Sequence, residues 1–195
     1  DFYSTPNIKG IEQYVNALLS ELELRINEID SPFNTVYIGG GTPSILPISL
    51  LNKIVDAISN YVNISSLEEF TIEANPEDVT EQWVKAIMRL GINRVSMGIQ
   101  SFNNDELKYI NRRHTAEVAL TAIQILQRSG ITCISGDLIY GLPGQDLESW
   151  KQSLKMLLSL RLPHFSAYLL SYEPGTRLYA RLMAGKVEEA SEDLA

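Results

Sequence analysis

The fold class is decided by one strand–helix–strand unit in the middle of the chain, RVSMGIQ (94–100), TAEVALTAIQILQR (115–128) and ITCISGDLIY (131–140). The outer segments are rich in apolar and β-branched residues, and the middle segment has the apolar spacing of a helix that ends at Ser129-Gly130. Two strands that are joined by a helix of this length are typical of a parallel sheet. We therefore predict an α/β fold.

The same alternation continues in both directions from this unit. We expect further strands over residues 36–38, 70–74 and 165–170, and further helices over 11–29, 47–62, 81–90, 104–110, 147–160 and 176–184. The strand ends then lie roughly 26 to 39 residues apart, a usual length for a βα repeat. A doubly wound sheet and part of a βα barrel both fit this pattern, which does not choose between them.

Composition limits the classes of function. The chain has 195 residues, 45 % of them hydrophobic, and a net charge of −8, which fits one globular domain without a basic, nucleic-acid-binding surface. No run of 18 apolar residues predicts a membrane span. The single cysteine, Cys133, forms no internal disulfide and favours a cytoplasmic location. We expect Cys133 to be a small buried residue of its strand.

Polar residues interrupt the apolar pattern where strands end. They are Gly39 to Thr42, Glu73, Gln100 and Asp137, followed by Tyr168 and Ser171 around the last strand. Burying a carboxylate or amide is costly unless it is paired, and parallel α/β folds build their sites at this edge of the sheet. We therefore expect these side chains to converge on one site. Alternatively, each of them caps a neighbouring loop.

Two short segments have alternative interpretations. The loop Gly39 to Pro43 matches neither G-x-G-x-x-G nor a Walker loop, so it either lets the backbone approach a ligand or is a tight connector. Arg112-Arg113-His114 precedes a helix and either grips a carboxylate or is a solvated basic loop. His114 and His164 have no partner at metal-ligand spacing, so we expect no metal there.

Several motifs, in this order and spacing, resemble those of radical S-adenosylmethionine (SAM) proteins, and most closely HemW-type haem chaperones. They are YIGGGTPS (37–44), IEANP (72–76), GINRVSMGIQSFN (91–103), Arg112-Arg113, GDLIYGLPGQ (136–145) and SYEPGT (171–176). The resemblance implies a partial (β/α)6 barrel, a [4Fe–4S] cluster held by three cysteines after the first strand, and SAM bound to that cluster. It also implies binding of haem or porphyrin and delivery of haem to accepting proteins.

The resemblance also implies that residues 1–195 are a truncated core. In this branch the third cluster cysteine directly precedes a segment like Asp1-Phe2-Tyr3-Ser4, so we expect the first strand, the cluster cysteines and a C-terminal accessory domain to lie outside the chain. We predict that these residues alone bind no cluster and make no radical. A sheet edge exposed in this way could pair two copies into a homodimer.

The resemblance assigns SAM-binding roles to individual residues. Gly40, Gly41 and Thr42 match a glycine-rich loop along the methionine end of SAM, and its polar contacts match Glu73, Gln100, Arg112, Asp137 and, less closely, Ser171. One alternative is an oxygen-independent coproporphyrinogen III oxidase of the HemN type, in which a fourth cysteine stands at the place of Phe2. Another is a phosphate-binding barrel enzyme that uses the Gly39–Thr42 loop.

Overall fold

The computed structural model describes residues 10–28 and 32–190, and its centre is a five-stranded parallel sheet. The strands are β1 (Thr35–Ile38), β2 (Glu69–Ala74), β3 (Arg94–Gln100), β4 (Cys133–Tyr140) and β5 (His164–Leu169). They lie in the order β1-β2-β3-β4-β5, so each strand pairs with the next one along the chain. A doubly wound sheet reverses its order part-way, whereas a βα barrel does not. The strand order therefore identifies a partial barrel.

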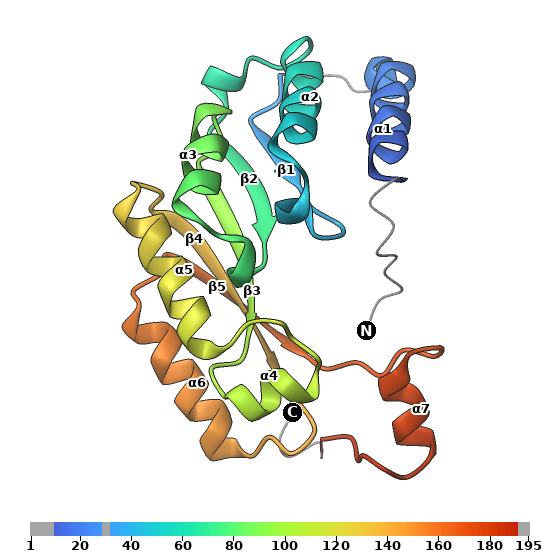
Figure 1. Ribbon diagram of the computed structural model, residues 1–195, viewed down its shortest axis with the longest axis vertical. Coiled ribbons are helices and arrows are strands. Elements are labelled where there is room, and N and C mark those ends of the chain that lie inside the picture. Colours follow the sequence, from blue (N-terminus) through green and yellow to red (C-terminus); the bar gives the residue numbers. More distant parts are fainter. Residues whose placement is uncertain (1–9, 29–31, 191–195) are drawn as a thin grey trace.

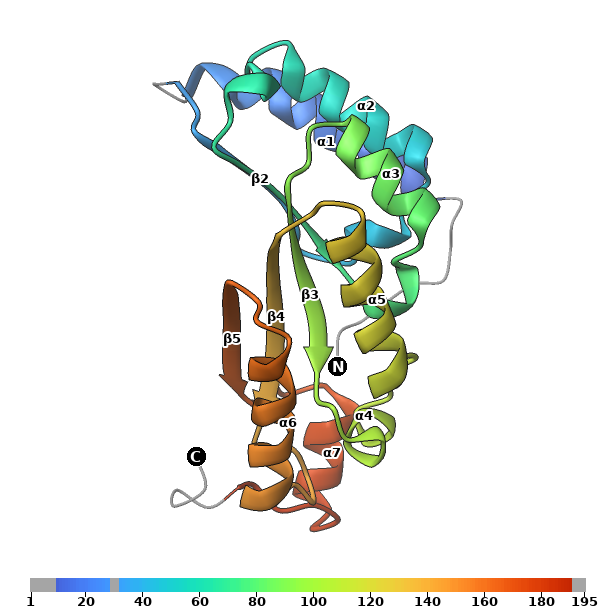
Figure 2. The ribbon, with the colours of Figure 1, turned by 90° about the vertical axis from the view of Figure 1, so that its left-hand side faces the viewer.

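Seven helices of the described residues pack on one face of this curved sheet, beyond the carboxyl ends of its strands, or on another helix. They are α1 (Ile11–Arg25), α2 (Ile48–Ser59), α3 (Glu81–Arg89), α4 (Asn104–Tyr109), α5 (Ala116–Arg128), α6 (Leu147–Ser159) and α7 (Arg177–Met183). Figures 1 and 2 show α3, α5 and α6 along the outer face, with α4 and α7 beyond the carboxyl ends of the strands. Helix α1 packs on α2 through Val15, Leu50 and Ile54. Within the described residues, no helix is both long enough and apolar enough to cross a membrane.

The two faces of the sheet differ in chemistry because side chains alternate along a strand. On the outer face, Phe70 and Ile72 of β2 and Met97 of β3 are fully buried in a core that α3 and α5 complete with Ile87 and Ile123. The residues between them point to the inner face and are mostly polar. This set comprises Thr71 and Glu73 of β2, Ser96 of β3, Ser135 and Asp137 of β4, and Ser166 of β5.

The helix-capping residues explain where the predicted boundaries were accurate and where they were not. Thr80 and Thr115 accept hydrogen bonds from the backbone N–H groups of Trp83 and Val118, so α3 and α5 begin where a threonine caps them. The strand expected from residue 131 begins instead at Cys133. The N–H of Ile131 bonds the Leu126 carbonyl across Gly130, so Ile131 belongs to the end of α5.

The expectation that Cys133 is buried was wrong. Cys133 is exposed, and it is the first residue of β4, at the amino edge of the sheet. Ser135, on the same face two residues later, is buried. Strand parity alone therefore does not predict burial at the end of a strand.

A buried phenylalanine and an exposed one test this account of the core. Phe70→Ala should lower the free energy of unfolding by about 3–5 kcal/mol, because Phe70 is fully buried between the sheet and its helices. Phe165→Ala, on edge strand β5 where the side chain is 41 % exposed, should lower it by less than half as much. Urea unfolding of both variants measures the difference, and equal losses would contradict the assignment of the core.

Candidate functional site

Glu73 holds the loop after β1 against the end of β2. Its Oε1 accepts a hydrogen bond from the Tyr37 hydroxyl at 2.9 Å, and its Oε2 accepts one from the Gly40 N–H at 3.1 Å. Gly40 has a φ of +96°, a left-handed conformation that glycine adopts without strain. The carboxylate is thus fixed by two donors before any ligand arrives.

Gly39 permits this close approach. A Cβ at residue 39 would lie 2.5 Å from a ring carbon of Tyr37 and 2.7 Å from Oε1 of Glu73. A side chain at residue 39 would therefore displace Tyr37 or the Glu73 carboxylate. The contact with Glu73 explains why a glycine stands at this position. Gly41 is exposed next to it, and Thr42 precedes the 3₁₀ turn Pro43–Ile45.

Asp137 lies near Glu73 on the inner face. Its carboxylate accepts a hydrogen bond from the Ser96 hydroxyl at 3.2 Å. Burial raises the pKa of Asp137, and the charge of Glu73 adds to this, while Ser96, Ser166 and His164 oppose it. Burial and the Glu73 carboxylate likewise raise the pKa of Tyr37 to about 12. The two carboxylates form a partly dehydrated acidic patch that suits a cation or hydroxyl donors.

Gln100 has a strained backbone at the end of β3. Its φ is +69°, it lies at an irregularity in the β3–β4 pairing, and the Ser101 N–H bonds the Ile99 carbonyl around it at 2.9 Å. This tight turn costs about 1–3 kcal/mol in a residue other than glycine. It brings the amide over Gly98, where a Cβ would lie 2.8 Å from Gln100 Nε2. Strain of this kind is concentrated at binding sites.

Arg112 approaches the same place from the loop between α4 and α5. Its Nη1 donates to Oδ1 of Asn75 at 3.4 Å, and its Nη2 would lie 3.9 Å from a Cβ at Gly98. Burial lowers the pKa of Arg112, partly offset by Glu77. Arg112 is therefore not part of a solvated loop, and the group that it contacts here is an amide.

The structure brings most of the predicted site residues together at the carboxyl edge of β2, β3 and β4. Glu73, Gly40 and Asp137 form one group. Gln100 at the end of β3 and Arg112 from the α4–α5 loop form a second group over Gly98. Ser171 is exposed beyond the end of β5, and no hydrogen bond within residues 10–28 and 32–190 connects it to either group. Phe2 lies outside the described residues.

Several contributors were missed by attention to strand ends alone. These are hydroxyl side chains within strands that hydrogen-bond one of the two carboxylates: Tyr37 bonds Glu73, and Ser96 and Ser166 bond Asp137. The signal for them was the period of two that places every second residue on the inner face. That period marks the inner-face positions of each strand, and the parallel register then brings Tyr37, Ser96 and Ser166 beside the two carboxylates.

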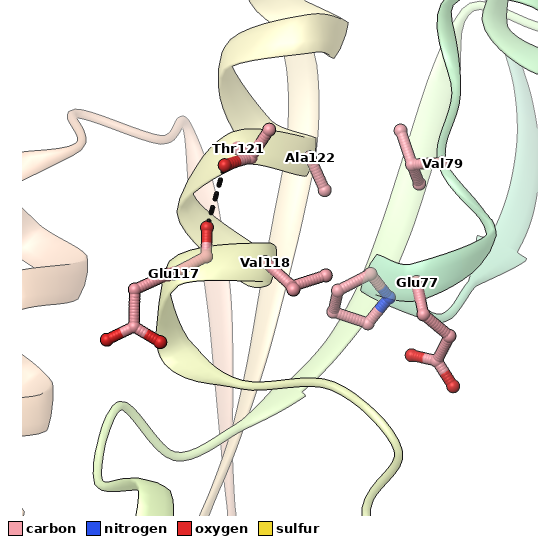
Figure 3. Close-up of a pocket in the computed structure, with 7 residues that line it drawn as sticks. Glu77, Val79, Glu117, Val118, Thr121 and Ala122 are labelled. Atoms are coloured by element: carbon pink, nitrogen blue, oxygen red, sulfur yellow. Dashed lines mark hydrogen bonds between the residues drawn. The ribbon is translucent and has the colours of Figure 1, made fainter.

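Two cavities of the described chain lie away from these side chains. A crevice of about 220 Å³ lies between α5 and the 3₁₀ turn η5 (Pro76–Asp78), where Figure 3 shows Val79 and Val118 facing the gap and the carboxylates of Glu77 and Glu117 pointing away. A second cavity of about 390 Å³ lies at the amino ends of the strands beside Asn93 and Cys133. Neither of these cavities includes Glu73, Gln100 or Asp137.

Comparison with known proteins assigns the chain to a family. The model of the radical SAM superfamily matches residues 2–157. The chain belongs to the radical SAM superfamily. It is 39 % identical over 183 residues to the haem chaperone HemW of Lactococcus lactis and 37 % over 179 residues to that of Bacillus subtilis, covering 94 % and 91 % of this chain and 48 % and 47 % of theirs. The chain thus spans about half the length of the curated relatives that it matches.

Solved structures agree with this assignment. Coproporphyrinogen III oxidase (HemN) from Escherichia coli superposes with a TM-score of 0.84 at 26 % identity, covering 97 % of this chain and 44 % of that one. Proteins of the superfamily use SAM together with a [4Fe–4S] cluster. The only cysteine in this sequence is Cys133, exposed at the amino edge of the sheet, so the residues of this chain do not fit the cluster. Carboxylates, an amide and a guanidinium at the opposite edge do fit a nucleoside with amino, hydroxyl and carboxylate groups.

The raised pKa of Asp137 makes a prediction about stability. Because its pKa is raised, Asp137 is harder to ionise in the folded protein than in the unfolded chain. Its ionisation therefore lowers the free energy of unfolding at pH values above the usual aspartate pKa. At low pH, where the group is protonated in both the folded and the unfolded state, it has no such effect. Asp137→Asn should therefore equal or exceed the wild type in stability at about pH 7, and lose that advantage near about pH 3.5. Urea unfolding at both pH values measures this, with Asp56→Asn at an exposed position of α2 as the surface control. A destabilised Asp137→Asn at neutral pH would show that the carboxylate is stabilising.

Proposed function

We propose that this chain forms the SAM-binding wall of a HemW-type haem chaperone. The observation that supports the proposal most strongly is the fixed Glu73 carboxylate, with Asp137 beside it and the Gln100 amide on the intervening strand. All three lie at the edge where parallel α/β folds bind their ligands. Their chemistry matches the groups that SAM presents.

Each residue has a role that its contacts allow. Glu73 and Asp137 accept hydrogen bonds from amino and hydroxyl groups, and Gln100 both donates and accepts. Arg112 pairs with a carboxylate, and the backbone of Gly40, Gly41 and Thr42 lies along the methionine end. Ser171, which is exposed beyond β5 and forms no hydrogen bond to either group of described residues, is assigned to the site by the resemblance alone. With a cluster supplied from cysteines that are not in this sequence, SAM provides radical chemistry.

The haem-related half of the proposal rests on the relatives. Those at 37–39 % identity are haem chaperones, which favours haem binding and delivery to haem-accepting proteins. The likeness to HemN supports a second candidate, oxygen-independent oxidation of coproporphyrinogen III.

Charge removal at the site tests SAM binding. In the whole gene product, reconstituted with iron and sulfide without oxygen, Glu73→Gln and Asp137→Asn should each weaken SAM binding about tenfold or more, because an acceptor with full charge is lost. Glu69→Gln, on the inner face of β2 at its other end, is the matched control and should bind normally. Titration calorimetry measures the three affinities. Unchanged binding in both site variants would remove the basis of the proposal.

Product analysis separates the two candidate functions. The same reconstituted protein should bind haem and transfer it in stoichiometric amounts to a haem-free acceptor protein. Absorbance spectroscopy measures this transfer. Incubation with coproporphyrinogen III, SAM and a reductant should yield no decarboxylated product. Catalytic decarboxylation would instead establish the oxidase.

A further inference from the structure

His114 is buried with both ring nitrogens engaged. The side chain has no exposed surface, its Nδ1 lies 3.1 Å from Oε2 of Glu77, and its Nε2 lies 3.0 Å from the carbonyl oxygen of Ile99. Its position in the sequence suggested only a histidine without metal-ligand partners. These contacts connect the loop before α5 with the turn after β2 and with the end of β3.

The contacts determine where the hydrogens of the ring lie. A carbonyl oxygen only accepts, so Nε2 carries a hydrogen and donates to Ile99. Oε1 of Glu77 lies 2.9 Å from Arg113, which also lies 3.8 Å from Asp78. Although burial acts to raise it, the pKa of Glu77 is lowered by His114 and Arg113. The carboxylate of Glu77 thus lies between Arg113 and the Nδ1 side of the His114 ring.

The Ile99 carbonyl is the acceptor that matters for the site. It receives both the His114 Nε2–H and the Ser101 N–H, and the second of these hydrogen bonds closes the turn around the strained residue Gln100. A carbonyl pinned in this orientation keeps the backbone of Gln100 left-handed. Released from His114, the turn could relax toward the β region, which a glutamine prefers.

We propose that His114 is a positioning residue that holds the left-handed turn at Gln100 and thereby places its amide against SAM. The inference rests on the proposed function, because it assigns SAM as the ligand of that amide. Arg112 lies two residues before His114, so the same anchor fixes the entry of the guanidinium beside Gly98.

Two substitutions of His114 each keep one of its two hydrogen-bonding contacts and remove the other. The amide nitrogen of glutamine reaches about as far as Nε2, so His114→Gln keeps the donor to Ile99. The amide nitrogen of asparagine reaches about as far as Nδ1, so His114→Asn keeps the contact with Glu77. Both variants lose one buried hydrogen bond, so urea unfolding should show similar losses of stability. Calorimetry on the reconstituted whole protein should show SAM binding about tenfold weaker in His114→Asn and within about twofold of wild type in His114→Gln.

Amide hydrogen exchange without SAM tests the contact independently. The Ser101 N–H should exchange about tenfold faster or more in His114→Asn than in His114→Gln, because its acceptor is no longer pinned. Equal Ser101 exchange in the two variants would overturn the inference, and so would SAM affinities that fall equally. If the wild type bound no SAM, the proposed function would fail, while faster Ser101 exchange in His114→Asn alone would still support the anchoring contact.

Discussion

The hydrogen bonds of the Glu73 carboxylate connect parts of the chain that sequence separates widely. Its donors, Tyr37 and Gly40, are 36 and 33 residues away. They can meet Glu73 because β1 and β2 pair in parallel, which puts the ends of both strands at one edge. Gly39 is the steric condition for this contact, since any Cβ there would collide with Tyr37 and Glu73. The geometry of the site therefore depends on a parallel register and one glycine.

Two residues of the site, Asp137 and Gln100, are held in forms that lower the stability of the folded protein. Burial opposes the ionisation of Asp137, and Gln100 adopts a left-handed turn that a glycine would adopt more easily. The core on the outer face, centred on fully buried residues such as Phe70 and Met97, supplies the stability that lets these states persist. Separate faces of one sheet thus serve folding and binding, as expected of an α/β barrel.

Much of the fold was predictable because period and capping are local signals. Alternating segments placed all five strands, but their order required the structure, since a doubly wound sheet obeys the same local rules. Ile131 was misplaced because a helix-ending hydrogen bond competes with the strand pattern. The strand-end rule brought Glu73, Gln100 and Asp137 together. It could not find Tyr37 or His114, because their partners are set by register and by loop packing rather than by spacing.

The central claim is that side chains from β2, β3 and β4 converge on one SAM molecule. The most direct measurement is a crystal structure of the whole gene product grown with SAM under anaerobic conditions. The account predicts polar atoms of SAM within about 3.2 Å of the carboxylates of Glu73 and Asp137 and the amide of Gln100. SAM bound elsewhere, for example in the crevice between α5 and the turn at Pro76–Asp78, with these three side chains uncontacted, would contradict it.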